Sequence, residues 1–178
     1  TQVFLYKFLH DKFVYEIRNI DNQFQNDDWE HKFSKMSVDE YEILTMKLNE
    51  NTAIFKPEQL ISTLFTRQNE ENYANIFDAA FLNIAKQNRD IFSVITGGGE
   101  KISLFENLSK YVSDNRDDFC KAIINKLVGF SFKNTFGQGF DFFATIFEYL
   151  IKDYNSDSGG KYAEYFTPHS VSRIMTRC

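Results

Sequence analysis

The residues with the clearest potential for chemistry lie in the stretch 158–169, which reads Ser-Gly-Gly-Lys-Tyr-Ala-Glu-Tyr-Phe-Thr-Pro-His. Thr167 followed by Pro168 predicts the start of a helix, because Thr is a favourable N-cap and Pro fits the first helical position. The first turn of a helix has backbone N–H groups without intrahelical partners, and these can bind a carboxylate or a phosphate. This stretch is therefore the candidate ligand site.

The other reactive residue types form no recognisable site. None of the three histidines, His10, His31 and His169, forms a metal-ligand pattern with Cys, Asp or Glu. We expect surface or structural roles for His10 and His31, and adjacent His10 and Asp11 are not expected to share a helix face. The sequence has no motif for Ser-His-Asp or Cys-His catalysis. It therefore predicts no catalytic residue and no metal site.

Composition favours a helical domain with a real core. The 178 residues include 20 Phe and 9 Tyr but only 2 Pro, with a net charge of −5. This charge gives no global basic field for nucleic acid, so DNA contact would need local basic patches or a partner.

The sequence favours a protein of the reducing cytoplasm, because Cys120 and Cys178 have no metal-ligand spacing and a disulfide framework is not expected. No apolar run is long enough to span a membrane, and no signal peptide is visible.

Apolar periodicity predicts the elements that must position the candidate site. A capping box at Ser37 and Glu40 marks one helix start, and Pro57 marks another. The polar run 155–160 reads as a linker, so we expect an all-α domain over residues 1–154 and the start of a second domain at 161–178. Helices are predicted over about 3–20, 37–49, 57–65, 76–84, 103–112, 116–129 and 140–154, with a short helical piece within 21–36.

Two passages resemble the modification subunit of type I restriction–modification systems. The first is the apolar segment 140–151 followed by 158–168, similar to the family's Tyr-Glu-Tyr-Leu-Ile helix that runs into Gly-Glu-Phe-Tyr-Thr-Pro. The second is 5–13, Leu-Tyr-Lys-Phe-Leu-His-Asp-Lys-Phe, similar to the family's early helix. The C-terminal passage is the specific one, and the middle of the chain is comparable only as a helical domain of suitable size.

The resemblance implies a helical N-terminal domain, here a helical bundle, before a Rossmann-like methyltransferase domain. The family's full subunit methylates adenine N6 in DNA with S-adenosylmethionine. It works with a second modification subunit, a specificity subunit and a restriction subunit. The Thr-Pro segment forms one wall of the family's cofactor site, which implies that the cofactor-binding residues here are Glu164, Tyr165, Phe166, Thr167, Pro168 and His169.

The sequence departs from the family pattern in three ways. Tyr165-Phe166 reverses the commoner Phe-Tyr order, and His169 stands where a charged residue is frequent. The Asn-Pro-Pro-Tyr/Phe motif that binds the extruded adenine is absent, since Pro57 and Pro168 are the two prolines. We therefore expect an N-terminal fragment that is itself inactive.

Two hypotheses follow for the helical part. In the first it clamps DNA and contacts other subunits after assembly, with phosphate contacts from Lys7, Lys12, Arg67, Lys133 or Lys161. In the second the chain is a free-standing helical protein–protein interaction module with no enzymatic role.

Overall fold

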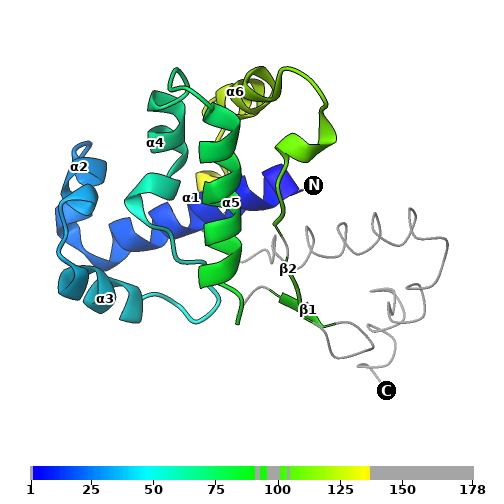
Figure 1. Cartoon of the computed structure of the whole chain (residues 1–178). Helices are drawn as coiled ribbons and strands as arrows, with labels where there is room; N and C mark the ends of the chain where they lie inside the picture. Colours follow the sequence, from blue (N-terminus) through cyan, green and yellow to red (C-terminus); the bar gives the residue numbers. More distant parts are fainter. Residues whose placement is uncertain (1, 91–92, 96–100, 104, 137–178) are drawn as a thin grey trace. The chain divides into compact units, whose positions relative to one another are not determined.

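The computed structural model describes residues 2–90, 93–95, 101–103 and 105–136 (Figure 1). The chain divides into two compact units, and the described residues all belong to the unit Gln2–Gly137. Its α-helices are α1 Gln2–Ile20, α2 Trp29–Ser34, α3 Val38–Met46, α4 Ile61–Thr66, α5 Tyr73–Gln87 and α6 Arg116–Leu127. The predicted boundary at 155–160 and the predicted helix at 140–154 lie outside the described residues.

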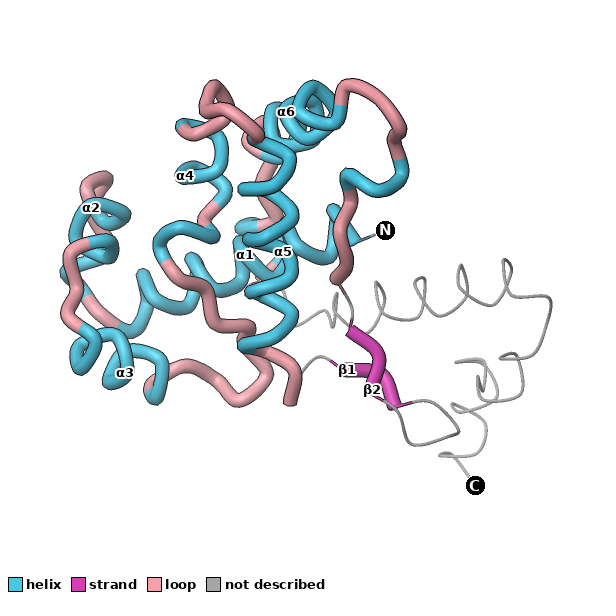
Figure 2. The backbone as a smooth tube through the Cα atoms, viewed as in Figure 1, coloured by secondary structure: helices cyan, strands magenta, loops and turns pink. Residues whose placement is uncertain are grey.

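Helices dominate this unit, which confirms the predicted all-α class (Figure 2). The described exception is one antiparallel pair of short strands, β1 Ser93–Ile95 and β2 Lys101–Ser103, with Val94 opposite Ile102. The described residues also form the short 3-10 turns η1 Asn22–Phe24, η2 Pro57–Gln59, η3 Ser109–Tyr111 and, after α6, η4 Lys133–Thr135.

α1 supplies the centre of the core. Six of its residues recur at helical spacing and are at most 2% exposed: Leu5, Tyr6, Phe8, Leu9, Phe13 and Ile17. α5 crosses α1 and buries Phe77 and Phe81, and the rings of Tyr6 and Phe81 lie 4.7 Å apart between their centroids (Figure 1). Because apolar surface removed from water stabilises the fold, this crossing fixes α1 inside the unit.

Sequence periodicity placed most helices correctly. The helix predicted over 3–20 is α1, and the stripe at 76–84 lies within α5. The capping box is present: the Ser37 Oγ accepts from the Glu40 N–H, and the Ser37 N–H donates to the Glu40 carboxylate at 2.8 Å. It begins α3, a helix of 9 residues whose single buried residue is Leu44.

Two element predictions were wrong. Pro57 begins only the 3-10 turn η2, because Leu60 is extended at φ −68° and ψ 145°, and α4 starts afterwards at Ile61. The helix predicted over 103–112 is replaced by β2, an extended stretch and η3. Strand pairing and a buried carboxylate on α5 override the helical spacing in this segment.

That carboxylate is Asp78, which is 6% exposed. It accepts hydrogen bonds from the Leu108 N–H at 2.9 Å, from the Ser109 N–H at 3.2 Å and from the Ser109 hydroxyl at 2.6 Å. Replacing Asp78 with alanine leaves these donors unsatisfied and is expected to cost about 2–4 kcal/mol of stability. Urea unfolding followed by the fluorescence of Trp29, the single tryptophan, measures this loss. A cost below that of a control substitution at exposed Asp118 would contradict the anchoring role of Asp78.

Candidate functional site

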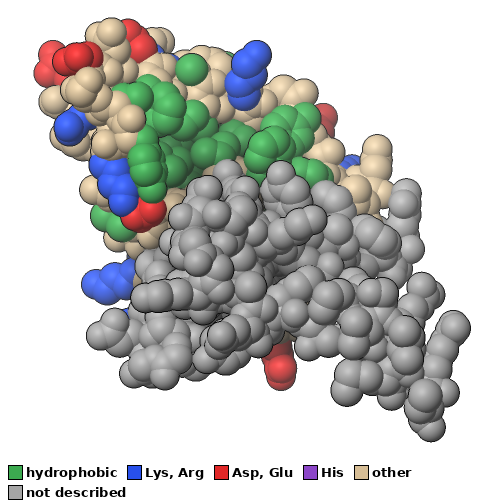
Figure 3. Space-filling model, turned by 90° about the vertical axis from the view of Figure 1, so that its right-hand side faces the viewer, with side chains coloured by type: hydrophobic (Ala, Val, Ile, Leu, Met, Phe, Trp, Pro, Cys, Tyr) green, Lys and Arg blue, Asp and Glu red, His purple; other side chains and the backbone are tan. Residues whose placement is uncertain are grey.

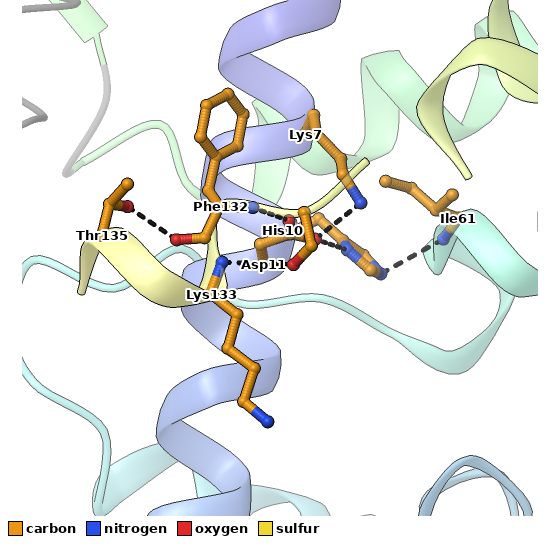
Figure 4. A network of polar contacts seen from close by, with 8 residues as sticks. Lys7, His10, Asp11, Ile61, Phe132, Lys133 and Thr135 are labelled. Carbon is orange, nitrogen blue, oxygen red and sulfur yellow. Dashed lines mark hydrogen bonds and ion pairs between the residues drawn. The ribbon is translucent and has the colours of Figure 1, made fainter. Parts of the chain in front are cut away.

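A buried polar network on α1 joins three ionisable side chains (Figure 4). The Lys7 ammonium lies 2.9 Å from the Asp11 carboxylate, and the His10 Nδ1 lies 3.1 Å from the same oxygen. All three residues are at most 8% exposed. Burying a charge is tolerated only when it is paired and hydrogen-bonded, so each member of this network depends on the others.

The bond between His10 and Asp11 corrects the expectation that these neighbours would not share a face. They reach one another because both side chains lean into the same buried space and not because their helix positions align. The predicted structural role of His10 is confirmed, and His31 is exposed as expected.

The contacts of His10 define its tautomer. Its Nε2 accepts from the Ile61 N–H at 3.3 Å, so its Nδ1 carries the proton that is donated to Asp11. Burial is the main cause that lowers the pKa of His10, and the nearby Asp11 offsets only part of this effect. His10 is therefore a neutral imidazole that ties α1 to the start of α4.

Asp11 also holds the segment that follows α6. Burial raises the pKa of Asp11, but hydrogen bonds from His10, the Phe132 N–H and Lys7 outweigh it, so that this pKa lies below its usual value. The Phe132 N–H donates to the second carboxylate oxygen at 2.8 Å. Asp11 is thus an ionised acceptor that joins α1 to a residue 121 positions away in the sequence.

Aromatic rings align the same segment along α1. Phe130 lies 6.1 Å from Phe4 and 5.4 Å from Phe132, measured between ring centroids. Phe136 lies 5.4 Å from Phe8 and 5.5 Å from Tyr15. Rings at these separations attract one another beyond the area that they bury. Segment 130–136 is therefore held against one side of α1 as far as the last described residue.

Part of this aromatic surface stays exposed. Phe4 is 58% exposed and Phe130 is 38% exposed. Figure 3 shows hydrophobic side chains gathered on one face of the described unit.

The neutral state of His10 predicts a pH-dependent stability. The folded-state pKa lies below the unfolded value, so the stabilising contribution is present above about pH 6.5 and is lost as the pH falls towards the folded pKa. Urea midpoints followed by Trp29 fluorescence are expected to fall over this range. In His10→Gln the fall should be smaller, whereas in the control His31→Gln it should match the unsubstituted protein. An unchanged slope in His10→Gln would contradict the assignment.

A groove of about 340 Å³ runs beside the network. One side is a stripe of α1 at spacing i, i+3, i+4 and i+7, formed by Asp11, Val14, Tyr15 and Arg18. Residues of α2 and of the segment 131–133 complete its walls. Its volume falls at the lower end of the range of ligand sites.

The predicted phosphate contacts lie in different environments. Lys7 is 5% exposed and paired with Asp11, so this candidate was wrong as a surface contact. The Lys12 ammonium donates to the Asn51 carbonyl at 3.2 Å, and the Arg67 Nε lies 2.8 Å from Glu70. Lys133 is exposed and lines the groove. The fifth candidate and the six predicted cofactor-binding residues, Lys161, Glu164, Tyr165, Phe166, Thr167, Pro168 and His169, lie outside the described residues.

Other reactive groups of the described unit form no site. Burial raises the pKa of Cys120 to about 12, so this thiol stays protonated and is no nucleophile. Among the described residues no group of three or more His, Cys, Asp and Glu side chains could hold a metal ion. None of the described helices combines the length and apolarity that crossing a membrane requires.

Sequence reasoning missed the groove residues Tyr15 and Arg18. Their spacing from Asp11 is visible in the sequence. It could not be told from an ordinary solvated helix face, because the segment 131–133 that lies beside it is more than 110 residues away in the chain.

Comparison with known proteins gives one result. No curated protein and no solved structure matches the chain. The family model described as N-6 DNA Methylase matches residues 138–178, directly after the described helical unit. Residues 138–178 are thus similar to the N-6 DNA methylases.

Proposed function

We propose that this chain is part of the modification subunit of a type I restriction–modification system, which transfers a methyl group from S-adenosylmethionine to adenine N6 in DNA. The observation that carries the proposal is the N-6 DNA methylase match over 138–178. The order of parts supports it as well, since a helical unit precedes the matched residues as the type I resemblance implies.

In this proposal the helical unit clamps DNA and contacts the specificity subunit, a second modification subunit and the restriction subunit. α1, whose sequence resembles the family's early helix, holds the segment 130–136 through Asp11. That segment leads directly into the residues matched by the methylase family.

The test uses the full-length protein coexpressed with its specificity subunit. Purified complex is incubated with duplex DNA and S-adenosylmethionine carrying a labelled methyl group, and N6-methyladenine is identified in the digested DNA. Labelled N6-methyladenine is the expected product. A complex that binds neither S-adenosylmethionine nor DNA would overturn the proposal and favour the interaction module.

The cofactor residues are tested separately by calorimetric titration with S-adenosylmethionine. Tyr165→Ala and Phe166→Ala are compared with Tyr162→Ala, which removes an aromatic ring just before the Glu-Tyr-Phe-Thr-Pro sequence. One of the first two substitutions should weaken binding through loss of an aromatic contact with the sulfonium, and the control should not. Equal affinities in all three would remove these aromatic residues from the cofactor site.

A further inference from the structure

We propose that the groove between α1, α2 and the segment 131–133 receives a backbone phosphate of the bound DNA. The inference rests on the proposed function and names the place where the helical unit would touch DNA. The groove brings together cationic and hydroxyl donors from two parts of the chain that are far apart in the sequence, Tyr15 and Arg18 of α1 and Ser131 and Lys133 of the segment 131–133.

Two cations flank the groove without a carboxylate partner among the described residues. The Lys133 ammonium makes no ion pair there, in contrast to Lys12 and Arg67. The Arg18 Nη2 donates to the Gln25 carbonyl at 2.6 Å, which orients the guanidinium and leaves its other N–H groups available. Cations that are not already neutralised are the groups that release counterions when a phosphate binds.

Tyr15 adds a neutral donor to the same groove. Its ring lies 5.5 Å from the Phe136 ring, which fixes its position on α1. Within the described part of the chain its hydroxyl makes no hydrogen bond. Tyrosine hydroxyls and arginine and lysine side chains are the usual donors to DNA phosphates.

The wall that carries Lys133 is fixed in advance. Asp11 accepts from the Phe132 N–H at 2.8 Å, and the Ser131 hydroxyl accepts from the Lys133 N–H at 3.1 Å (Figure 4). The Lys133 side chain points away from the buried network (Figure 4). These contacts order the backbone of Lys133 and leave its ammonium unpaired by any described residue. Binding therefore costs little conformational entropy in this segment.

Two carboxylates, Asp11 and Glu30, also line the groove and affect how strongly it would bind a phosphate. The Asp11 carboxylate is neutralised by Lys7 at 2.9 Å. Glu30 also lines the groove, and no ion pair to it occurs among the described residues. Its charge opposes a phosphate, so removing this charge should strengthen DNA binding while removing the cations should weaken it.

The experiment measures the retention of duplex DNA by the assembled complex over a series of salt concentrations. Lys133→Gln and Arg18→Gln are expected to weaken binding several-fold, and the double variant should reduce the salt slope by about 0.9, the value for one phosphate contact, with a smaller reduction in each single variant. Tyr15→Phe should weaken binding without changing the slope, and Glu30→Gln should strengthen it. The control Lys121→Gln removes an equal charge from α6, outside the groove, and should change neither quantity.

The outcomes separate this inference from the function on which it rests. If the unsubstituted complex neither methylates nor retains DNA, both fail. If it does both and the groove variants match Lys121→Gln, the groove inference alone is wrong. Inorganic phosphate and adenosine monophosphate are titrated in parallel. Binding of either one to the groove, with DNA retention unaffected by the variants, would assign the site to a small anion and overturn the DNA inference.

Discussion

Replacing Asp11 with alanine is expected to lower the free energy of unfolding by about 3–5 kcal/mol, because it leaves a buried lysine without its counter-charge. Lys7 loses its 2.9 Å partner, and the Phe132 N–H and the His10 Nδ1–H lose their acceptor. Urea unfolding followed by Trp29 fluorescence measures the change. Hydrogen exchange should show segment 130–136 opening more readily, since its main polar tie to α1 is gone.

Two further variants test the cause of this effect. Asp11→Asn keeps the shape and one acceptor oxygen but loses the charge, so its cost should lie between those of Asp11→Ala and the unsubstituted protein. Asp28→Ala is the matched control, because the Asp28 carboxylate pairs with Lys32 at 3.1 Å on the surface, where ion pairs contribute little. A similar small cost for Asp11→Ala and Asp28→Ala would contradict the assigned role of the buried network.

Replacing Phe55 with alanine is expected to cost about 3–5 kcal/mol, the range for a large side chain removed from a packed core. Phe55 is fully buried, and its ring centroid lies 6.1 Å from that of Tyr6, 5.8 Å from His10 and 5.4 Å from Phe13. The cavity would open beside both the core and the polar network. Thermal and urea unfolding of the full chain, followed by Trp29 fluorescence, give the loss.

The loss of stability should increase with the size of the cavity that each substitution leaves. Phe55→Leu fills more of the space and should cost less than Phe55→Ala. Phe4→Ala removes the same ring from a position that is 58% exposed and should have a much smaller cost. Equal losses for the alanine variants at 4 and 55 would show that the ring at position 55 is not part of the core.

Local patterns were sufficient where one helix face had to be apolar. Most residues of α1 and α5 that the 3.6-residue period singled out are buried, although Phe4 is 58% exposed and Ile76 is half-buried, and the Ser37 capping box forms as its sequence indicated. Burial of an amphipathic face and the satisfaction of helix-end N–H groups are properties of neighbouring residues, so the sequence is enough to predict them. The N-6 DNA methylase match likewise falls where the sequence resemblance was strongest.

Interactions across long sequence separations could not be predicted in this way. Lys7 looked like a surface cation until Asp11 and the Phe130 ring, 5.4 Å from its ammonium, enclosed it. Phe55 belongs to a stretch without helical periodicity, yet it fills the core between α1 and its neighbours. Burial and charge pairing depend on which distant segments meet, and a single sequence without its fold does not contain that information.

The sequence by itself determined the helical class, the main helices and the type of enzyme family that the C-terminal residues resemble. Only the tertiary structure decided which polar side chains form buried contacts within the protein and which remain available for a ligand. It made Asp11 the acceptor that holds segment 130–136, and it left Lys133 exposed at a groove. The physical reason is that desolvation and pairing fix the role of a charged side chain, and both are set by the surroundings that folding creates.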